Sequence, residues 1–215
     1  MFKIQKFDLL LAIYIFCILA SELMGGKTFP LLNIFGYQLN ASVAILILPF
    51  IFTANDMVTE VFGKERAKSL VRSGLVVVVL NIIFAALATA LEPSARFAGT
   101  EAAYDKIFST AIRISGASLI AFALAEFLDV YIFAKLREKL GQAKLWFRNN
   151  LSNFVSQLTD TVIFMTLAFW AFDKGASDNV LFLVSLILPY WLLKCAMSVI
   201  ETPLVYLGVK WLRKN

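Results

Sequence analysis

The chain has 215 residues, of which 60% are hydrophobic and 16% are charged, and its formal net charge is +5. Charged residues this scarce leave a soluble domain without a polar surface, so the composition excludes an ordinary water-soluble protein and indicates a membrane protein. Nucleic-acid binding is excluded as well, because no segment carries a basic stripe interleaved with aromatic residues. We expect residues 1–215 to form a single membrane domain.

Six apolar stretches have the length that a helix needs to cross a bilayer, about 20 residues. They lack the alternation of barrel strands, so we expect an all-α integral membrane protein with six transmembrane helices. The last stretch is longer than one span requires, so it should tilt, kink near Pro189 or Pro203, or run past the interface. In chain order the stretches are Phe7–Met24, Asn40–Met57, Ser73–Leu91, Thr110–Phe133, Leu151–Phe172 and Val180–Val209.

The connections on one side of the membrane hold most of the 20 Lys and Arg residues. Cytoplasmic connections retain basic residues preferentially, so both termini are predicted to lie in the cytoplasm. The N-terminal segment also resembles a signal peptide, but its removal would leave an odd number of spans, and we expect a retained first helix. The side predicted to be cytoplasmic carries Lys3, Lys6, Lys64, Arg66, Lys68, Arg72, Lys135, Arg137, Lys139, Lys144, Arg148, Lys210, Arg213 and Lys214.

Several kinds of chemistry are absent from the sequence. The chain has no histidine, and its two cysteines, Cys17 and Cys195, lie within apolar stretches, as small buried hydrophobic residues commonly do. We find no phosphate-binding loop, dinucleotide fingerprint or cysteine cluster. We therefore expect no metal, no cofactor and no enzymatic activity.

Ionisable residues inside the apolar stretches carry the functional information. Each such side chain costs about 2.5 to 3.5 kcal/mol at the centre of a lipid-facing helix, so these groups should face one another, a cavity or the interface. Helical spacing places Asp56 with Glu60 and Glu126 with Asp129 on single helix faces. The predicted topology brings polar groups from four helices to similar depth in the cytoplasmic half. The residues are Glu22, Asp56, Glu60, Glu126, Asp129, Asp160, Lys194 and Glu201.

Simpler roles remain open for some of these groups. The alternative for Glu60 is a pair with Lys64 at the interface, and the alternative for Glu22 is a solvated position beside Lys27 at the outer end. The alternative role of Lys194 is to balance the charge of Asp160 or Glu201. A short similarity between residues 126–133 and 157–164 is compatible with an internal repeat, a feature common in transporters.

Residues 52–67, FTANDMVTEVFGKERA, resemble the signature of the VUT, or queuosine precursor transporter, family. Further positions follow in the family's order and spacing along nearly the whole chain. One departure is Ser21-Glu22, where many members are expected to have Asn. The matching positions are Ser118, Glu126, Asp129-Val130, Arg148-Asn149-Asn150, Ser152, Gln157, Asp160-Thr161, Lys194, Glu201-Thr202-Pro203 and Tyr206.

The resemblance implies uptake of queuosine precursors, 7-cyano- or 7-aminomethyl-7-deazaguanine, across the cytoplasmic membrane of a prokaryote. A guanine-like ring presents an N–H and an amine side by side, and a carboxylate accepts both hydrogen bonds. Trp191 is an alternative to Tyr190 as the stacking residue. The predicted substrate-binding residues are Asn55, Asp56, Glu126, Asp129, Gln157, Asp160, Tyr190, Lys194 and Glu201.

Energy coupling and assembly are left open by the sequence. Without a nucleotide-binding motif, we favour a facilitator or a proton-linked carrier, with the lipid bilayer and a purine-like small molecule as partners and homo-oligomerisation undecided. The alternatives are a substrate-binding subunit of a modular vitamin importer and an intramembrane acid–base enzyme. The enzyme needs two carboxylates close together and a route for water.

Overall fold

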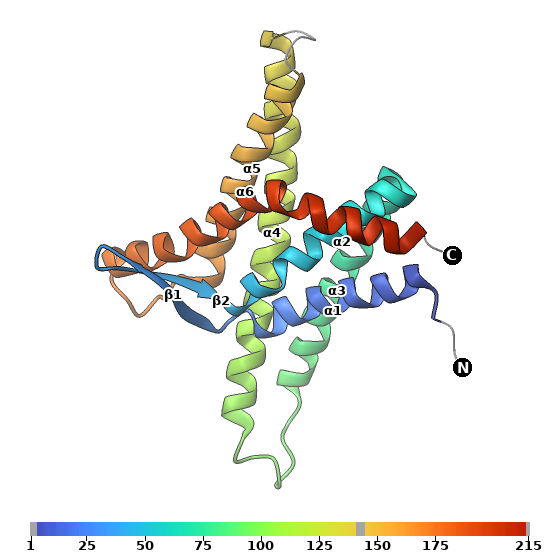
Figure 1. Cartoon of the computed structure of the whole chain (residues 1–215). Coiled ribbons are helices and arrows are strands. Elements are labelled where there is room, and N and C mark those ends of the chain that lie inside the picture. The colour runs from blue at the N-terminus through green and yellow to red at the C-terminus, as the bar shows by residue number, and fades with distance from the viewer. Residues whose placement is uncertain (1–3, 141–144, 214–215) are drawn as a thin grey trace. The chain divides into compact units, whose positions relative to one another are not determined.

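The computed structural model describes residues 4–140 and 145–213, and this part of the chain is mostly helical (Figure 1). A small antiparallel sheet of β1 (Thr28–Ile34) and β2 (Tyr37–Ser42) and a short 3-10 helix η1 (Val43–Leu46) separate the first two helices. The helices are α1 (Lys6–Met24), α2 (Leu48–Phe62), α3 (Lys64–Ala90), α4 (Glu101–Leu140), α5 (Leu145–Phe169) and α6 (Ala176–Arg213).

The β hairpin corrects the prediction of an all-α chain. The predicted second span began at Asn40, but the chain is extended to Ser42 and α2 begins only at Leu48. Phe35 and Gly36 both have positive φ, 51° and 85°, which suits a tight hairpin turn, and the Gly36 N–H donates to the Asn33 side chain at 3.0 Å. The turn lies in the predicted connection, and only the end of β2, from Asn40 to Ser42, overlaps with the predicted span.

Helix α2 is shorter than the predicted second span. Its 15 residues correspond to about 22 Å, less than the ~30 Å hydrocarbon core of a bilayer. The helix ends where Gly63 adopts a φ of 83° and donates its N–H to the Thr59 carbonyl at 3.0 Å. Helix α3 begins at the next residue, so the basic segment that was predicted to be a connection is already helical.

Four described helices are long and apolar enough to cross a membrane, and a shorter apolar helix covers Phe154–Phe169. At most a third of the residues in any of the four apolar windows is buried within the protein. Most of the other apolar side chains in these windows are at least partly exposed, which is unfavourable in water and favourable in lipid. The protein is therefore a multi-pass membrane protein. The four helices are Lys6–Met24, Glu65–Ala90, Glu101–Ala125 and Ala176–Ala196.

The contacts divide the chain into two compact units. Unit 1 comprises Met1–Phe29, Ser42–Ser115 and Ala196–Asn215, and unit 2 comprises Pro30–Ala41 and Gly116–Cys195. The long helices α4 and α6 each contribute one part to each unit.

The core of unit 1 joins α1, α2 and α3 with the C-terminal part of α6. Gly208 permits this packing, because a side chain there would overlap with Met57 of α2. The Lys6 ammonium of α1 donates to the backbone carbonyl of Trp211 at 2.7 Å, so the first turn of α1 lies beside the last turn of α6. The core contains Leu10, Tyr14, Ala54, Met57, Val58 and Leu70, with Val205 and Leu212 packed against it.

In unit 2, the C-terminal part of α5 and the N-terminal part of α6 form a helical hairpin. The buried Asn179 side chain accepts from the Ala171 N–H and donates to the Ala171 carbonyl, both at 2.8 Å, and so closes the turn. The β hairpin is attached to α6 by two bonds. Tyr37 donates to the Leu181 carbonyl at 2.6 Å, and Asn40 donates to the Ser185 hydroxyl at 2.8 Å.

Candidate substrate site

The predicted site residues are distributed over both units. Asn55 and Asp56 belong to α2 in unit 1, whereas Gln157, Asp160, Tyr190 and Lys194 belong to α5 and α6 in unit 2. The predictions for Glu126, Asp129 and Glu201 lie outside the residues whose side chains the structure describes. Among the described site residues, the structure brings Asp160 and Lys194 of unit 2 into contact.

An ion pair joins the two helices of unit 2. The Lys194 ammonium donates to the Asp160 Oδ2 at 2.5 Å, and the two side chains are only 13% and 25% exposed. Either charge alone would be costly at such a position, so each one stabilises the other. Of the two acidic partners considered for Lys194, the structure places Asp160 in contact, and the second oxygen of this carboxylate has no bond to another described residue.

Trp191 lies one helical turn before Lys194 and provides an unusual donor. Its ring contacts Phe154 of α5 edge to face, with ring centroids 4.8 Å apart and an interplanar angle of 70°. Its indole N–H is buried and has no hydrogen-bond partner among the described residues. A buried donor without a partner costs about 1 to 3 kcal/mol, which a ligand can recover once the surrounding side chains move aside.

Polar and aromatic side chains of unit 2 meet at two contacts between α5 and α6, the Asp160–Lys194 pair and the Phe154–Trp191 ring contact. Phe154, Gln157 and Asp160 follow one another at intervals of three residues on α5, so they fall on neighbouring positions of one helix face. Gln157 is half-buried, and the Tyr190 side chain is buried. An amide, a carboxylate, an ammonium and an indole N–H beside aromatic rings can bind a flat heterocycle by hydrogen bonding and stacking.

Unit 1 holds a separate polar position on α2. Asn55 is half-buried beside the Tyr14 side chain of α1, and its Oδ1 is buried without a hydrogen-bond partner in the described part of the chain. Asp56 is exposed. The sequence did not indicate the contribution of Tyr14, because a single tyrosine in an apolar helix carries no distinguishing pattern.

The two acidic residues with simpler alternatives, Glu60 and Glu22, lie in different surroundings. Glu60 lies 3.7 Å from Arg213 of α6, and both side chains are largely exposed, so the pair contributes little to stability. The side chain of Lys64, its expected partner, lies outside the described set. Glu22 is buried, with 7% of its surface exposed.

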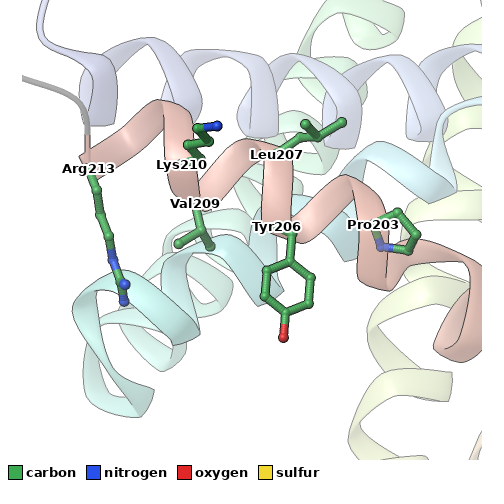
Figure 2. A pocket seen from close by; sticks show the side chains of 6 residues that line it. All are labelled: Pro203, Tyr206, Leu207, Val209, Lys210 and Arg213. Atoms are coloured by element: carbon green, nitrogen blue, oxygen red, sulfur yellow. The ribbon is translucent and has the colours of Figure 1, made fainter.

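One open groove of about 800 Å³ lies on the C-terminal part of α6 (Figure 2). It belongs to unit 1, and none of the predicted substrate residues lines it. No group of three or more metal-ligating side chains occurs within the described part of the chain.

Comparisons with known proteins place the chain among transporters. A family model described as "Putative vitamin uptake transporter" matches residues 42–208. A protein of Bacillus subtilis named "Probable queuosine precursor transporter" is 31% identical over 196 residues, which are 91% of this chain and 81% of that protein. No solved structure matches the chain.

Two shorter matches agree with this result. The "Queuosine precursor transporter" of Escherichia coli is 29% identical over 123 residues, which cover 57% of this chain and 52% of that protein. A "Probable queuosine precursor transporter" of Haemophilus influenzae is 29% identical over 136 residues, which cover 62% of this chain and 54% of that protein. The signature around Asp56 and Glu60 lies inside the matched region, and the chain belongs to the vitamin uptake transporter family.

Proposed function

We propose that this protein imports the queuosine precursors 7-cyano- or 7-aminomethyl-7-deazaguanine, which the cell then uses for tRNA modification. The observation that carries the proposal is the 31% identity, over 91% of this chain, with a protein named as a probable queuosine precursor transporter. Four described helices of membrane-spanning length support it, since a carrier needs several spans. Membership of a transporter family favours a carrier over an intramembrane enzyme.

In the proposed complex, the deazaguanine ring binds against the helical hairpin of unit 2. The second carboxylate oxygen of Asp160 accepts from the ring N–H or the exocyclic amine, while Lys194 holds the carboxylate in place. The indole N–H of Trp191 supplies a donor for the ring carbonyl. Charge-assisted hydrogen bonds contribute about 1.5 to 3 kcal/mol each, and stacking adds about 1 to 3 kcal/mol. Three such contacts give roughly micromolar affinity.

The acidic residues of α4 complete the proposed site. Glu126 and Asp129 lie one helical turn apart in sequence, and a second carboxylate can neutralise the cationic aminomethyl group of one precursor. Asp129→Asn should therefore weaken binding of the aminomethyl precursor more than binding of the cyano precursor. Equal losses for both precursors would remove this role from Asp129.

We also propose the finer topology: six spans in the cytoplasmic membrane, with both termini inside. The basic residues on the predicted cytoplasmic side support it. The contact between Lys6 and Trp211 supports it too, because it brings the beginning of α1 and the end of α6 together and therefore to the same side.

The function is testable in a bacterial strain that neither makes nor imports the precursors. Expression of this protein should restore queuosine in tRNA when either precursor is added to the medium, as mass spectrometry of tRNA nucleosides would measure. Asp160→Ala should abolish the restoration at unchanged membrane abundance, whereas Asp178→Ala, an exposed carboxylate in the first turn of α6, serves as the matched control. Absence of restoration by the intact, membrane-inserted protein would refute the proposed function.

A further inference from the structure

The C-terminal part of α6 presents an exposed face that the proposed transport function does not use. This face forms the open groove of Figure 2, whose volume is about 800 Å³. Tyr206 and Leu207 are 73% and 67% exposed, although both have large apolar surfaces. Lys210 and Arg213 line the same groove, with Lys210 extending from the edge of the helix that carries Leu207 and Arg213 from the edge that carries Tyr206. The lining residues are Pro203, Tyr206, Leu207, Val209, Lys210 and Arg213.

The orientation of this face is fixed by packing on the other side of α6. Val205 and Leu212 pack against the core of unit 1, and Gly208 lies against Met57. The helix cannot rotate about its axis without removing these residues from the core and bringing a bulkier side chain against Met57. The groove face therefore stays outward.

Contacts inside unit 1 also set the depth of the groove relative to the membrane. Helix α1 is long and apolar enough to cross a bilayer, and Lys6 in its first turn donates to the Trp211 carbonyl. Lys210 and Arg213 flank Trp211, so their charges lie at the level of the membrane surface where α1 begins. At 1.5 Å per residue, Leu207 lies about 6 Å and Pro203 about 12 Å from Trp211 along the helix, toward the hydrocarbon.

We propose that this groove binds an acidic phospholipid. The phosphate would lie between Lys210 and Arg213, and the upper part of an acyl chain would cover Leu207, Tyr206 and Pro203. The groove has two cations at the membrane surface and apolar side chains deeper in the membrane. An acidic phospholipid has its anionic headgroup and its acyl chain in the same order. Among the described residues, Glu60 pairs with Arg213 at 3.7 Å, and Lys6, 5.8 Å from the centre of the Trp211 ring, adds a further positive charge.

The proposal is tested by titrating the purified protein in neutral detergent with dioctanoyl-phosphatidylglycerol and with dioctanoyl-phosphatidylcholine. The shift of the thermal unfolding midpoint reports binding. The acidic lipid should bind saturably and more tightly than the zwitterionic lipid. Because each basic residue near an anionic lipid accounts for about a fivefold change in affinity, Lys210→Gln with Arg213→Gln should weaken phosphatidylglycerol binding about 30-fold.

A matched control separates the groove from general attraction to positive charge. Lys68→Gln with Arg72→Gln removes the same charge from exposed positions on α3 and should leave the phosphatidylglycerol affinity unchanged. Equal weakening by both double variants, or equal binding of the two lipids, would overturn the proposal. Glycerol 1-phosphate should bind far more weakly than the lipid, and equal affinity would identify a soluble-anion site instead.

Two further measurements keep the test decisive. If the double variant does not fold, the single Lys210→Gln variant should still show the fivefold loss, and Lys210→Arg should bind as the unmodified protein does. Light scattering in detergent addresses the competing occupant of the groove, a second copy of the chain. A dimer that Leu207→Ser dissociates would overturn the lipid proposal in favour of a protein interface.

Discussion

Replacement of Lys194 by Met leaves the Asp160 carboxylate without its cationic partner between α5 and α6. The paired atoms are 2.5 Å apart, and the two side chains are 13% and 25% exposed. At an effective dielectric constant of about 20, unit charges this close attract by about 7 kcal/mol, and the cost of removing both from water opposes most of this attraction. Loss of one partner of a buried pair costs about 3 to 5 kcal/mol, and partial exposure places the present pair at about 3 kcal/mol.

A double-mutant cycle separates the structural role of the pair from its role in transport. Lys194→Met and Asp160→Asn should each lower the unfolding midpoint of the detergent-solubilised protein, and the double variant should recover most of the loss because no charge is left unpaired. Uptake should not recover in the double variant, because the protein no longer has the Asp160 carboxylate that binds the substrate. Additive destabilisation would refute the coupling, and recovered uptake would remove Asp160 from the substrate site.

Further predictions concern other contacts in the two units. Trp191→Phe keeps the ring contact with Phe154 but removes the N–H that has no partner among the described residues. The variant should raise the KM for uptake about 5- to 50-fold without lowering the unfolding midpoint. An unchanged KM would contradict the role of the indole donor. Gly208→Leu should destabilise the protein by about 1 to 3 kcal/mol by overpacking against Met57, whereas Gly99→Leu, which meets no neighbouring atom in the described structure, should not. Asn179→Ala should cost about 1 to 3 kcal/mol, since the Ala171 N–H and carbonyl lose their partner at the turn between α5 and α6.

The helical character and the membrane class of the chain were predictable from sequence, because hydrocarbon-length apolar runs leave few other folds. The hairpin around Phe35 and Gly36 was not predictable, since these residues lie in the connection before the predicted second span and the turn depends on positive φ at two residues. The end of α2 at Phe62, five residues beyond the predicted span, likewise depends on one residue, Gly63. Local backbone conformation of this kind leaves little trace in a hydropathy pattern.

The candidate site was predicted in part. Asp160 and Lys194 were identified because ionisable groups in apolar helices are rare, and the structure pairs them. The sequence could not rank Trp191 above Tyr190, because the two residues are adjacent. Only the structure shows that the indole N–H is buried without a partner among the described residues and that the ring contacts Phe154. The predicted convergence of Asp56 with the acidic residues of α4 stays a prediction.

Uptake of radiolabelled 7-cyano-7-deazaguanine into proteoliposomes that contain only the purified protein tests the central claim most directly. Transport should be saturable, should be inhibited by unlabelled 7-aminomethyl-7-deazaguanine but not by adenine, and should be lost in the Asp160→Ala variant. Uptake that equals that of protein-free liposomes, or uptake that Asp160→Ala leaves unchanged, would contradict the claim.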